Sequence, residues 1–551
     1  MTAALLYRPE AYSIAGRRLM GRNAAGEAFL RAYFAHKRAG AMWIRVDDTR
    51  HARDFAAAAR AAGRDDKVMA VGASALSALA EPGTLYCPAP NIGELAWQRA
   101  SLGDAAWALC GITHTTSSAN AMDMIAGIVA SPVRRFDALI CTSEAVKDNV
   151  ARVLDAQASF LARRLGAKNF ATPQLPVIPL GVHTADFDVA PAERAAARKT
   201  LGAEADTLVV LFLGRLSFHA KAHPLAMYLA LQRAKIATGK RVLLVECGWH
   251  ANAAIAKAFA DGARLACPGV PVKTLDGRDA AVRRRAWAAA DVFVSLADNI
   301  QESFGISPLE AMAAGLPCVV ADWDGYRDTV RHGTDGFRIP TLMPPAGLGS
   351  DLALRHALGA DDYDAYIGNV AALTSVDIDA AATAFARLFA SAPLRQRMGA
   401  AAQKRAREIY DWKHIFARYE TLWEAQTAMR LADAPRERRA AHPWPARLDP
   451  FHAFARYPTR RLEASAKLAL AGGRDAAACV RYVEDLRALA MVGFAKTVLP
   501  EPAEIRAVLA AAAGGAKPAA ELVACIAAKR RPHVFRALVW LVKLGALKLV
   551  A

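Results

Sequence analysis

Short apolar runs alternate with longer amphipathic stretches along the first 430 residues of the chain. The runs are rich in Val, Leu and Ile, as is typical of strands buried on both faces of a parallel sheet. Between them lie Ala-rich stretches such as residues 26–39, which place apolar side chains on one face of a helix. The clearest runs are residues 42–46, 108–114, 136–142, 207–214, 241–247 and 317–321. The alternation predicts an α/β protein with two Rossmann-like, doubly wound domains in series.

The predicted domain boundaries follow from where this pattern changes. We expect the first Rossmann-like domain over residues 1–180 and the second over residues 181–430. Residues 431–450 carry four prolines and no helical period, which indicates a linker. Residues 451–551 are Ala-rich and predict a helical accessory domain. Ligands of doubly wound sheets bind at the carboxyl ends of the strands, so a site is expected in a cleft between the two larger domains.

The chain carries a strong positive charge that is concentrated towards its end. Its 551 residues include 70 Lys and Arg against 52 Asp and Glu, which gives a net charge of +18. Residues 431–551 contain 20 basic and 10 acidic residues, and therefore contribute +10 of this charge. Such a balance favours an anionic partner for residues 451–551, either a membrane surface or an acidic protein. No nucleic-acid fold signature accompanies the basic runs, so no nucleic acid is expected as a partner.

Several features of the sequence bear on where the protein acts. The eight cysteines are scattered without C-x-x-C pairs, which favours reduced and mostly buried thiols. The first residues show no secretory signal, and no apolar run is long enough for a bilayer-spanning helix. We therefore expect a cytoplasmic protein, with peripheral binding at the inner membrane face as an alternative. Residues 532–551 are predicted as a core helix of the accessory domain, with a membrane contact as the rival interpretation.

Residues 298–325 carry the most informative pattern, DNIQESFGISPLEAMAAGLPCVVADWDG. Ser307 and Glu310 have the S-x-x-E spacing of a capping box, with proline at the first helical position. The loop 303–306 would then direct backbone N–H groups outward, which favours an anion or an oxygen-rich ligand. Glu302 precedes this loop without an obvious structural partner. On this segment alone, a plain capping role for Glu310 and a solvated Glu302 are equally open.

A second pattern places two cations at a strand end. Gly214 closes the run 207–214, Arg215 follows it directly, and Lys221 comes six residues later. An Arg that donates paired hydrogen bonds and a mobile Lys suit a diphosphate at the mouth of a βα loop, although basic residues after a strand are usually just solvated. Residues 283–285, three arginines on a predicted helix, are interpreted as a solvated face.

Together these patterns resemble the retaining GT-B glycosyltransferases of family 4. The resemblance covers about residues 1–430. Its most specific part is the E-x7-E element from Glu302 to Glu310 with the tail EAMAAGLP, and the G-R…K element at Arg215 and Lys221 also matches. Further matches are FDALICTSEAVKDNV, VIPLGVHTADF, DGFRI and DWKHIFARYETLW, the last resembling a helix that crosses back to the first domain. The resemblance implies the GT-B fold and a nucleotide-diphosphate sugar as donor.

The resemblance also implies roles for the charged residues. Arg215 and Lys221 would hold the diphosphate and stabilise it as the leaving group. Glu310 would accept hydrogen bonds from the ribose hydroxyls, and Glu302 would contact the donor sugar near its anomeric carbon. The implied reaction is same-face substitution with retention, in which the leaving phosphate helps to deprotonate the acceptor. No Asp-x-Asp metal motif stands out, and the two cations can supply a metal's charge, so neither a metal nor another cofactor is expected.

Backbone groups are implied to complete the donor site. Gly214 belongs to the G-R…K element, and the amides of Phe304, Gly305 and Ile306 would touch the sugar or the phosphate. These residues match the family's pattern in the segment ESFGI. The residues just before it, SLADNIQ, depart from the Pro-Ser common in the family, so the identity of the sugar is not predicted.

The first domain is implied to contribute two further elements. His114 lies at the carboxyl end of a predicted strand, where related enzymes often have a histidine that contacts the donor sugar; the plain alternative is a strand-end histidine bonded to backbone. The loop 16–27 occupies the place of the family's glycine-rich loop but spaces its glycines apart. Gly21 and Arg22 in this loop would meet either the donor or an anionic acceptor, and a solvated basic loop is the alternative.

The sequence therefore predicts a retaining glycosyltransferase that acts on an unidentified sugar or lipid-linked acceptor. Synthesis of a cell-surface polysaccharide or a glycolipid is the expected setting. A same-fold nucleotide-sugar epimerase or glycoside phosphorylase is one rival, against which the paired G-R…K and E-x7-E elements argue. A catalytically silent nucleotide-sugar-binding or scaffold protein is the rival from another class.

Overall fold

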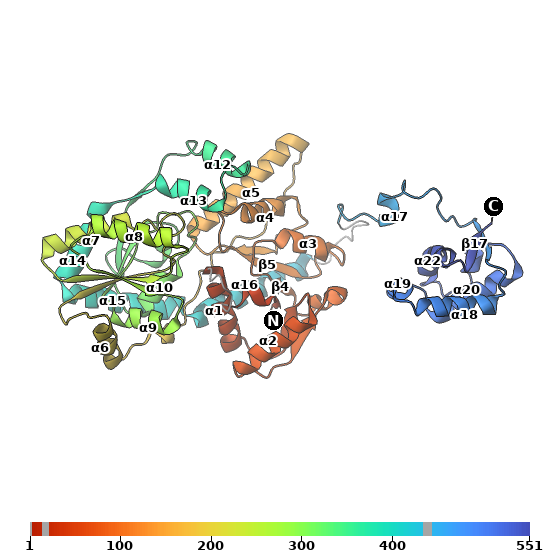
Figure 1. The fold of residues 1–551 in the computed structure, drawn as a ribbon, viewed down its shortest axis with the longest axis horizontal. Helices are drawn as coiled ribbons and strands as arrows, with labels where there is room; N and C mark the ends of the chain where they lie inside the picture. Colours follow the sequence, from red (N-terminus) through yellow and green to blue (C-terminus); the bar gives the residue numbers. More distant parts are fainter. Residues whose placement is uncertain (1–2, 14–20, 434–443, 551) are drawn as a thin grey trace. The chain divides into compact units, whose positions relative to one another are not determined.

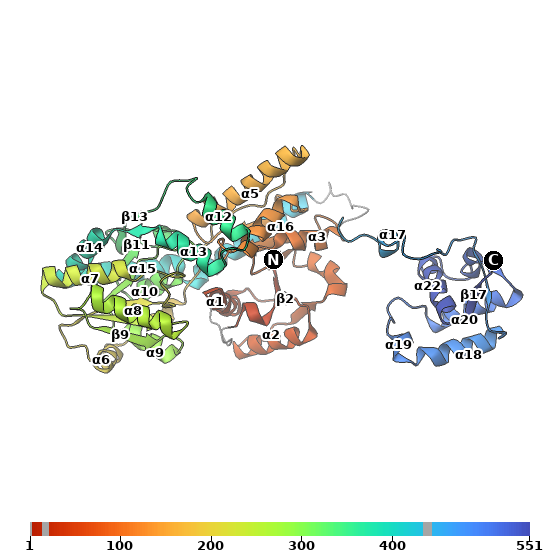
Figure 2. The same cartoon turned by 45° about the horizontal axis from the view of Figure 1, so that its top comes forward.

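The computed structural model describes residues 3–13, 21–433 and 444–550, and the side chains of Gly21 and Arg22 lie outside its description. The chain divides into two units, Met1–Pro445 and Ala446–Ala551 (Figure 1; Figure 2 shows the same ribbon turned by 45°). The division falls inside residues 431–450, the segment in which the sequence predicts a linker. The two units are described separately below.

The first sheet of the larger unit is parallel and has the order β3-β2-β1-β4-β5-β6. This is the order of a doubly wound sheet, in which the chain starts in the middle and winds outwards in both directions. Strands β4, β5 and β6 are buried along their whole length, as expected for strands that are covered on both faces. The strands are β1 (Ala4–Leu6), β2 (Met42–Arg45), β3 (Val68–Val71), β4 (Thr84–Tyr86), β5 (Ala108–Ile112) and β6 (Ala138–Ile140). The accompanying helices are α1 (Gly21–His36), α2 (Thr49–Ala61), α3 (Ile92–Ala100), α4 (Ala119–Gly127) and α5 (Glu144–Leu165).

The second sheet repeats this topology, with the order β12-β11-β10-β7-β8-β9 and parallel pairing throughout. Residues of β7 alternate between two cores: Val210 packs with helices α7, α8 and α14, whereas Val209 and Leu211 pack on the side of α9 and α10 (Figure 1). The strands are β7 (Leu208–Leu213), β8 (Val242–Gly248), β9 (Val272–Asp276), β10 (Val292–Ser295), β11 (Cys318–Ala321) and β12 (Gly336–Ile339). The helices are α6 (Pro191–Thr200), α7 (Leu225–Thr238), α8 (Ala253–Ala266), α9 (Ala280–Ala289), α10 (Ile306–Ala313), α11 (Tyr326–Thr329), α14 (Ile378–Ala390) and α15 (Ala392–Arg405). The prediction of two Rossmann-like domains in series is confirmed.

The two passages of the described chain between these sheets lie side by side. The amide of Val182 donates to the carbonyl of Tyr410 at 2.9 Å, and the amide of Trp412 donates to the carbonyl of Val182 at 3.2 Å. A Cβ atom on Gly181 would lie 2.5 Å from the Trp412 ring, so only glycine allows this approach. The outgoing and returning segments are therefore joined where they cross.

Helix α16 (Trp412–Asp433) follows the return passage and packs into the first sheet's core. Tyr419 and Trp423 are buried there, and Gln426 Nε2 donates to the carbonyls of Leu109 and Phe136 at 2.8 and 3.0 Å. This is the position expected for the crossing helix implied by DWKHIFARYETLW. The helix ties the first half of the unit (residues 3–180) to the second half (181–411).

An excursion from the second half was not identified in the sequence. Strands β13 (Thr341–Leu342) and β14 (Ser375–Val376) pair antiparallel and form its stem. Between them lie helices α12 (Ser350–Ala357) and α13 (Tyr363–Ala372). The hydroxyls of Tyr363 and Ser117 are 3.1 Å apart, so the excursion contacts the first half. The apolar residues of this stretch are irregularly spaced, so its helical period is not apparent in the sequence.

The C-terminal unit combines helices with a small antiparallel sheet of order β16-β15-β17. Its core contains Leu468, Val508, Leu538 and Leu541. The elements are α17 (Pro450–Ala453), β15 (Lys467–Leu470), α18 (Ala476–Arg487), α19 (Ala490–Gly493), α20 (Pro502–Ala511), β16 (Lys517–Pro518), α21 (Ala519–Leu522), α22 (Arg531–Lys543) and β17 (Leu547–Leu549). The prediction of a helical region is right for the helices but missed the sheet, because its strands are very short and carry lysines.

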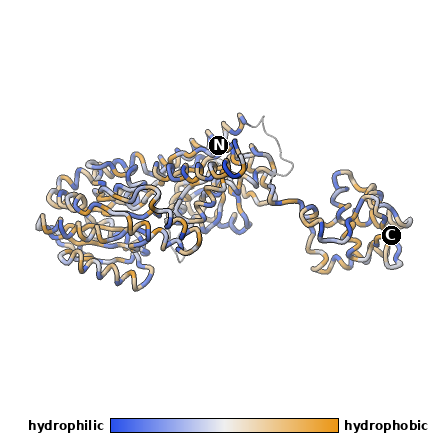
Figure 3. Tube along the Cα trace, turned by 90° about the horizontal axis from the view of Figure 1, so that it is seen from above, coloured by the Kyte–Doolittle hydropathy of each residue, from blue (hydrophilic) through white to orange (hydrophobic). Residues whose placement is uncertain are grey.

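Helix α22 packs its apolar side into this core, with Val534, Ala537, Leu538 and Leu541 buried. The core-helix interpretation of residues 532–551 is thus the one that the structure supports. Along the trace, hydrophobic and hydrophilic stretches alternate throughout (Figure 3). Of the helices that the structure describes, none is long and apolar enough to cross a membrane. Seven of the eight cysteines are buried and all are unpaired, as predicted, with Cys525 exposed.

Candidate functional site

Three glycines bring the ends of β7, β8 and β9 unusually close together. A Cβ atom on Gly248 would lie 1.9 Å from the carbonyl oxygen of Gly214, and one on Gly277 would lie 2.9 Å from the Cα of Gly248. Such distances exclude any side chain, so the residues at both contacts must be glycine. The loops that leave these strands are therefore packed closely together at the carboxyl edge of the second sheet. This is the edge at which doubly wound folds bind ligands.

Arg215 and Lys221 face the loop that follows β10. Arg215 Nη2 donates to the carbonyl of Ala220 at 2.8 Å and to Oε1 of Gln301 at 3.0 Å. Lys221 Nζ forms an ion pair with Oε2 of Glu302, and the two side chains are 24% and 10% exposed. The structure thus brings the predicted cations to the predicted carboxylate. Because both cations are partly exposed, each retains N–H groups that can meet an anion from solvent.

Buried polar residues hold the cation loop in place. Oδ1 of Asp298 accepts from the amide of His223 at 3.2 Å, and Asn299 Nδ2 donates to the carbonyl of His219 at 2.7 Å. Burial raises the pKa of Asp298 to about 7. Both side chains are almost completely buried. Asp298 and Asn299 therefore position the loop that carries Lys221, a role that the sequence did not indicate.

Glu302 has a second fixed partner in Tyr326. The Tyr326 hydroxyl donates to Oε2 of Glu302 at 3.2 Å and lies 2.8 Å from Oγ of Ser295. The Tyr326 ring is completely buried. A phenol and an ammonium group therefore share one oxygen of the carboxylate, which fixes its orientation at the mouth of the site. The sequence interpretation of Glu302 as lacking a structural partner is wrong.

The predicted capping box at Ser307 and Glu310 is also wrong. Helix α10 begins at Ile306 with Gly305 as its N-cap, at φ +84°, and no side chain caps it. A Cβ atom on Gly305 would lie 1.9 Å from the ring of Tyr326. The packing of this ring therefore requires glycine here and starts the helix earlier than the S-x-x-E spacing predicts. Phe304 is buried, so only the backbone of this turn can meet a ligand.

Glu310 is left available for a ligand because it caps nothing. No side-chain hydrogen bond to its carboxyl is found among the residues that the structure describes. Burial raises its pKa to about 7, whereas Arg283 and Lys221 act in the opposite direction. Arg283 Nη1 donates to the carbonyls of Gly277 and Arg278 at 2.8 and 3.1 Å, which fixes it beside Glu310. The interpretation of residues 283–285 as a solvated face is therefore wrong for Arg283.

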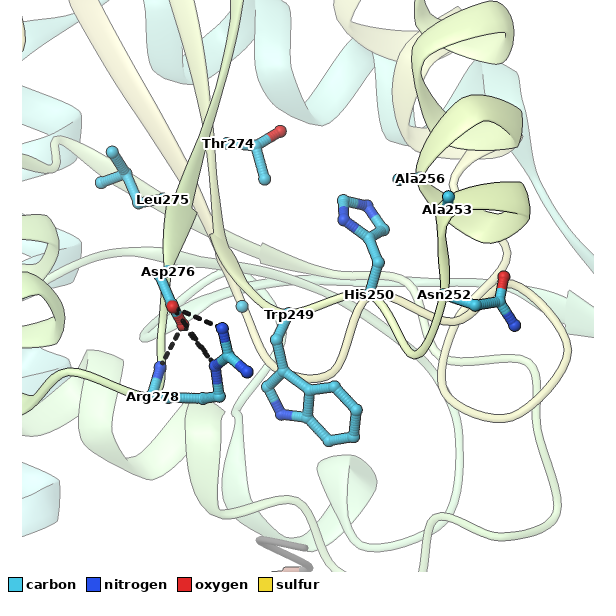
Figure 4. Close-up of a pocket in the computed structure, with 10 residues that line it drawn as sticks. Trp249, His250, Asn252, Ala253, Ala256, Thr274, Leu275, Asp276 and Arg278 are labelled. Carbon is cyan, nitrogen blue, oxygen red and sulfur yellow. Dashed lines mark hydrogen bonds and ion pairs between the residues drawn. The ribbon is translucent and has the colours of Figure 1, made fainter. Parts of the chain in front are cut away.

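A hollow of about 450 Å³ adjoins this edge at the ends of β8 and β9 (Figure 4). Arg278 donates to Asp276 at 2.7 Å, and this pair lowers the pKa of Asp276 to about 2. Trp249 and His250 also line the hollow (Figure 4). The lining residues are Gly248, Trp249, His250, Asn252, Ala253, Ala256, Thr274, Leu275, Asp276 and Arg278. Nothing in the sequence indicated this hollow except the aromatic residue directly after a strand.

The first half meets the loop that follows β10 at His114. Ser303 Oγ donates to the carbonyl of His114 at 2.6 Å, which joins the first half to the segment beside Glu302. The side chain of His114 lines a small pocket with aromatic residues, among them Tyr12 and Tyr86. Residues 14–20, the surroundings of Gly21 and the side chain of Arg22 lie outside the description, so the predicted role of Gly21 and Arg22 stays a prediction.

A polar seam continues this contact between the halves. Ser143 Oγ lies 2.8 Å from Oδ1 of Asp324 and 3.0 Å from the carbonyl of Ser303. The amide of Glu144 donates to Oδ2 of Asp328 at 2.9 Å, so α5 begins against carboxylates of the second half. Burial raises the pKa of Asp324 to about 7. Asp324 also has φ +41°, a strained value for a residue other than glycine.

Two doubly wound sheets, the returning helix α16, and the G-R…K and E-x7-E elements at the second sheet define a GT-B glycosyltransferase fold. Residues 193–342 match the model of the family Glycosyl transferases group 1. The matched segment contains Arg215, Lys221, Glu302 and Glu310.

The chain is similar to several curated proteins over part of its length. D-inositol 3-phosphate glycosyltransferase of Thermobispora bispora is 30% identical over 239 residues, which are 41% of this chain and 52% of that protein. Phosphatidyl-myo-inositol mannosyltransferase of Mycobacterium leprae is 40% identical over 90 residues, which are 16% of this chain and 22% of that protein. The chain thus spans about half the length of the first relative and less of the second.

Solved structures resemble the chain at low sequence identity. Anabaena HepE in complex with UDP is 16% identical, with a TM-score of 0.48 over 77% of this chain and 100% of that chain. Sucrose-phosphate synthase of Thermosynechococcus elongatus is also 16% identical, with a TM-score of 0.48 over 78% and 99% of the two chains.

Proposed function

We propose that this protein is a retaining glycosyltransferase that moves a sugar from a nucleotide-diphosphate sugar to an as yet unidentified acceptor. The observation that carries the proposal is the convergence of Arg215, Lys221, Glu302 and Glu310 at one edge of the second sheet, beside a hollow of about 450 Å³. The family match over residues 193–342 supports the same reaction class.

The parts of the donor would divide among these groups by chemistry. Trp249 supplies an aromatic face for the nucleobase in the hollow. Glu310 accepts hydrogen bonds from the ribose, since its carboxyl has no partner of its own in the described structure. Arg215 and Lys221 bind the diphosphate, and Glu302 meets the sugar. His114 approaches the sugar from the first half. Its backbone carbonyl accepts a hydrogen bond from Ser303, in the loop that follows β10.

The reaction follows from this placement. The bond between the anomeric carbon and the diphosphate oxygen breaks, and the acceptor oxygen bonds to the same face of that carbon. The acceptor proton passes to the departing diphosphate, whose charge Arg215 and Lys221 stabilise. Lys221 exchanges its contact with Glu302 for the diphosphate, which frees the carboxylate to stabilise positive charge on the sugar. We propose that these fixed cations make a divalent metal unnecessary.

The acceptor and the setting are proposals of lower detail. The two relatives are named for acceptors that contain inositol, one of them a lipid, and we propose a sugar or lipid-linked acceptor here. Synthesis of a cell-surface polysaccharide or glycolipid in the cytoplasm fits such an acceptor. The C-terminal unit would bind an anionic partner, because residues 446–551 carry 17 basic and 8 acidic residues.

The test is a panel of nucleotide sugars read by thermal unfolding, followed by turnover. A donor at 100-fold its dissociation constant stabilises the folded state by about 2.7 kcal/mol. The matching donor should then release nucleoside diphosphate when candidate acceptors are added, and NMR of the product should give the retained anomeric configuration. Stabilisation by a donor without any release across the acceptor panel would favour the silent scaffold instead.

A further inference from the structure

Large apolar side chains are exposed over one short stretch of the C-terminal unit. Met491 and Phe494 are each 80% exposed, and Leu489 and Val498 are 47% and 50% exposed. They lie on and around α19, between the end of α18 and the start of α20. We call Leu489, Met491, Phe494 and Val498 the apolar tip.

The core of the unit does not use the apolar tip. Its buried side chains come from the facing sides of α18, α20 and α22 and from β15, and include Val483, Val508 and Leu538. A well-formed core next to an exposed methionine and phenylalanine indicates an interaction site, because soluble domains seldom leave such side chains together in water.

A second exposed segment precedes β15 in the same unit. Phe451 is 71% exposed, Phe454 52% and Tyr457 82%. The rings of Phe454 and Tyr457 contact each other, with centroids 5.1 Å apart. A phenylalanine ring prefers an apolar environment, and a tyrosine ring prefers one that is apolar around the ring and wet at the hydroxyl.

The charges around both segments are almost entirely positive. No acidic residue occurs between Asp485 and Glu501, whereas Arg487 precedes the apolar tip and Lys496 lies within it. Arg456 lies within the aromatic segment, and Arg460 and Arg461 follow it. Within the part of the chain that the structure describes, Arg456, Arg460, Arg487 and Lys496 have no acidic partner. Their charge is therefore available to an anionic surface.

We propose that the apolar tip, together with the aromatic segment, inserts into the headgroup region of an anionic lipid bilayer. Methionine and the aromatic rings would enter the acyl boundary, and the neighbouring arginines and lysine would meet the headgroups. Each basic residue near such a surface adds to the electrostatic attraction, and two insertion segments bind more firmly than one.

A bilayer fits these observations better than a protein partner does. The exposed side chains of the apolar tip lie on and around a single-turn helix. A lipid surface accommodates projecting side chains without a complementary shape, whereas a protein partner needs a packed and matching surface.

The proposed membrane contact lies around α19 and the aromatic segment, not on α22. The sequence raised residues 532–551 as the rival membrane contact, but α22 packs its apolar face into the core. Only the consequence, delivery of the enzyme to a lipid-linked acceptor, rests on the proposed function. Lipid binding itself can be measured without donor or acceptor, so the two can fail independently.

The experiment is sedimentation of the full chain with phosphatidylglycerol–phosphatidylcholine vesicles and with phosphatidylcholine vesicles. Wild type should bind the anionic vesicles and not the neutral ones, and binding should weaken between about 0.1 M and about 1 M salt, as the screening length falls. Met491→Ser/Phe494→Ser should weaken binding by about ten-fold or more, because two apolar insertions are lost. Lys496→Glu should weaken it by a few-fold.

Two matched controls keep the test specific. Leu354→Ser/Leu358→Ser removes exposed apolar area from α12 and its C-cap, where these side chains are 58% and 74% exposed, and should bind as wild type does. Arg536→Ala/Val539→Ser alters the exposed side of α22 and should reduce binding less than the change in the apolar tip. Circular dichroism and thermal unfolding of each variant confirm that it is folded.

Three results would overturn the proposal. Wild type could fail to bind anionic vesicles, or Met491→Ser/Phe494→Ser could bind as tightly as wild type while folded. Light scattering could instead give a dimer that the same double substitution converts to a monomer, which would assign the apolar tip to a second copy of the chain.

Discussion

Lys221 forms an ion pair with Glu302, joining the loop after β7 to the loop after β10. Lys221 is thus held by the carboxylate that is proposed to face the donor sugar. A bound diphosphate would compete for Lys221, and the carboxylate would gain freedom as the cation leaves. Binding of the leaving group and exposure of Glu302 are therefore coupled through one contact.

Substitution of Glu302 should separate binding from transfer. In Glu302→Gln, Lys221 loses its charged partner, so affinity for a nucleoside diphosphate should be unchanged or higher. Transfer should fall about 100-fold or more, because a charge opposite the reacting sugar is lost. Isothermal titration and initial rates give the two quantities. Weaker nucleoside diphosphate binding in this variant would contradict the assignment.

Substitution of Glu310 should show the reverse pattern. Glu310→Gln keeps the size of the side chain but removes a charged acceptor for the ribose, so nucleoside diphosphate affinity should drop about ten-fold or more. The stability of α10 should change little, since Glu310 does not cap it. Free phosphate or diphosphate, which lack the ribose, should bind the variant and wild type equally. Equal affinity losses in the Glu302 and Glu310 variants would refute the separate roles.

Arg215 should matter through its geometry as well as its charge. Arg215→Lys should recover only part of the activity that Arg215→Ala loses, because lysine cannot donate to two oxygens at fixed positions. Turnover of wild type should continue in excess chelator, since the leaving charge is met by Arg215 and Lys221. Activity that disappears with chelator and returns with magnesium or manganese would refute this prediction.

The pH dependence of stability should report Asp324. Burial raises its pKa to about 7, with Glu302 and Asp328 adding to the shift, whereas an unfolded Asp titrates near 3.9. Between these values the folded state binds a proton that the unfolded state lacks, so this group's stabilising contribution decreases as pH rises and is lost above about pH 7. Asp324→Asn abolishes that titration.

The measurement is the difference in free energy of unfolding between Asp324→Asn and wild type. It should shift in favour of the variant between about pH 4 and 7, by up to about 4 kcal/mol. Other buried acids, such as Asp298 and Glu310, are present in both proteins and largely cancel in the difference. A difference that stays constant over this range would show that Asp324 is ionised in the folded protein at low pH.

A buried ion pair in the first half should be important for stability. Arg99 and Asp137 are 0% exposed and are joined by bonds of 2.6 and 2.9 Å. Asp137→Asn would leave the arginine buried without its counter-charge and should cost about 3–5 kcal/mol in urea unfolding. The exposed pair of Arg152 and Asp148 is the control, and Asp148→Asn should cost less than about 0.5 kcal/mol.

The C-terminal unit should be separable from the larger unit. A chain that ends at Pro445 keeps the α16 contact between Arg135 and Asp433, at 2.6 Å, and the stacking of Trp97 on Trp444. It should stay folded and bind donor as the full chain does. Ending the chain near Ala434 removes Trp444, so we expect a small loss of stability. Unfolding of the chain that ends at Pro445 would place the last 106 residues within the catalytic fold.

Local pattern was enough to predict the sheets but not the fine structure of the site. Strand runs such as 207–214 are apolar on both faces, so their burial follows from composition alone. The start of α10 could not be predicted, because it is set by the packing of Tyr326 against Gly305, 21 positions away. Arg283 looked solvated for the same reason: its partners, the carbonyls of Gly277 and Arg278, become neighbours only through the turn after β9.

The bonded crossing of the chain at Val182 and Trp412 also limits how the two halves can move. Since the two segments of the crossing are hydrogen-bonded to each other, they would act as a single hinge axis rather than as two independent linkers. In a rotation about this axis, atoms that lie farther from the axis move over a longer distance. The contact between Ser117 and Tyr363 and the contact between Ser303 and His114 would therefore break and re-form together. The distance between the Ser117 and Tyr363 hydroxyls would report the angle between the halves.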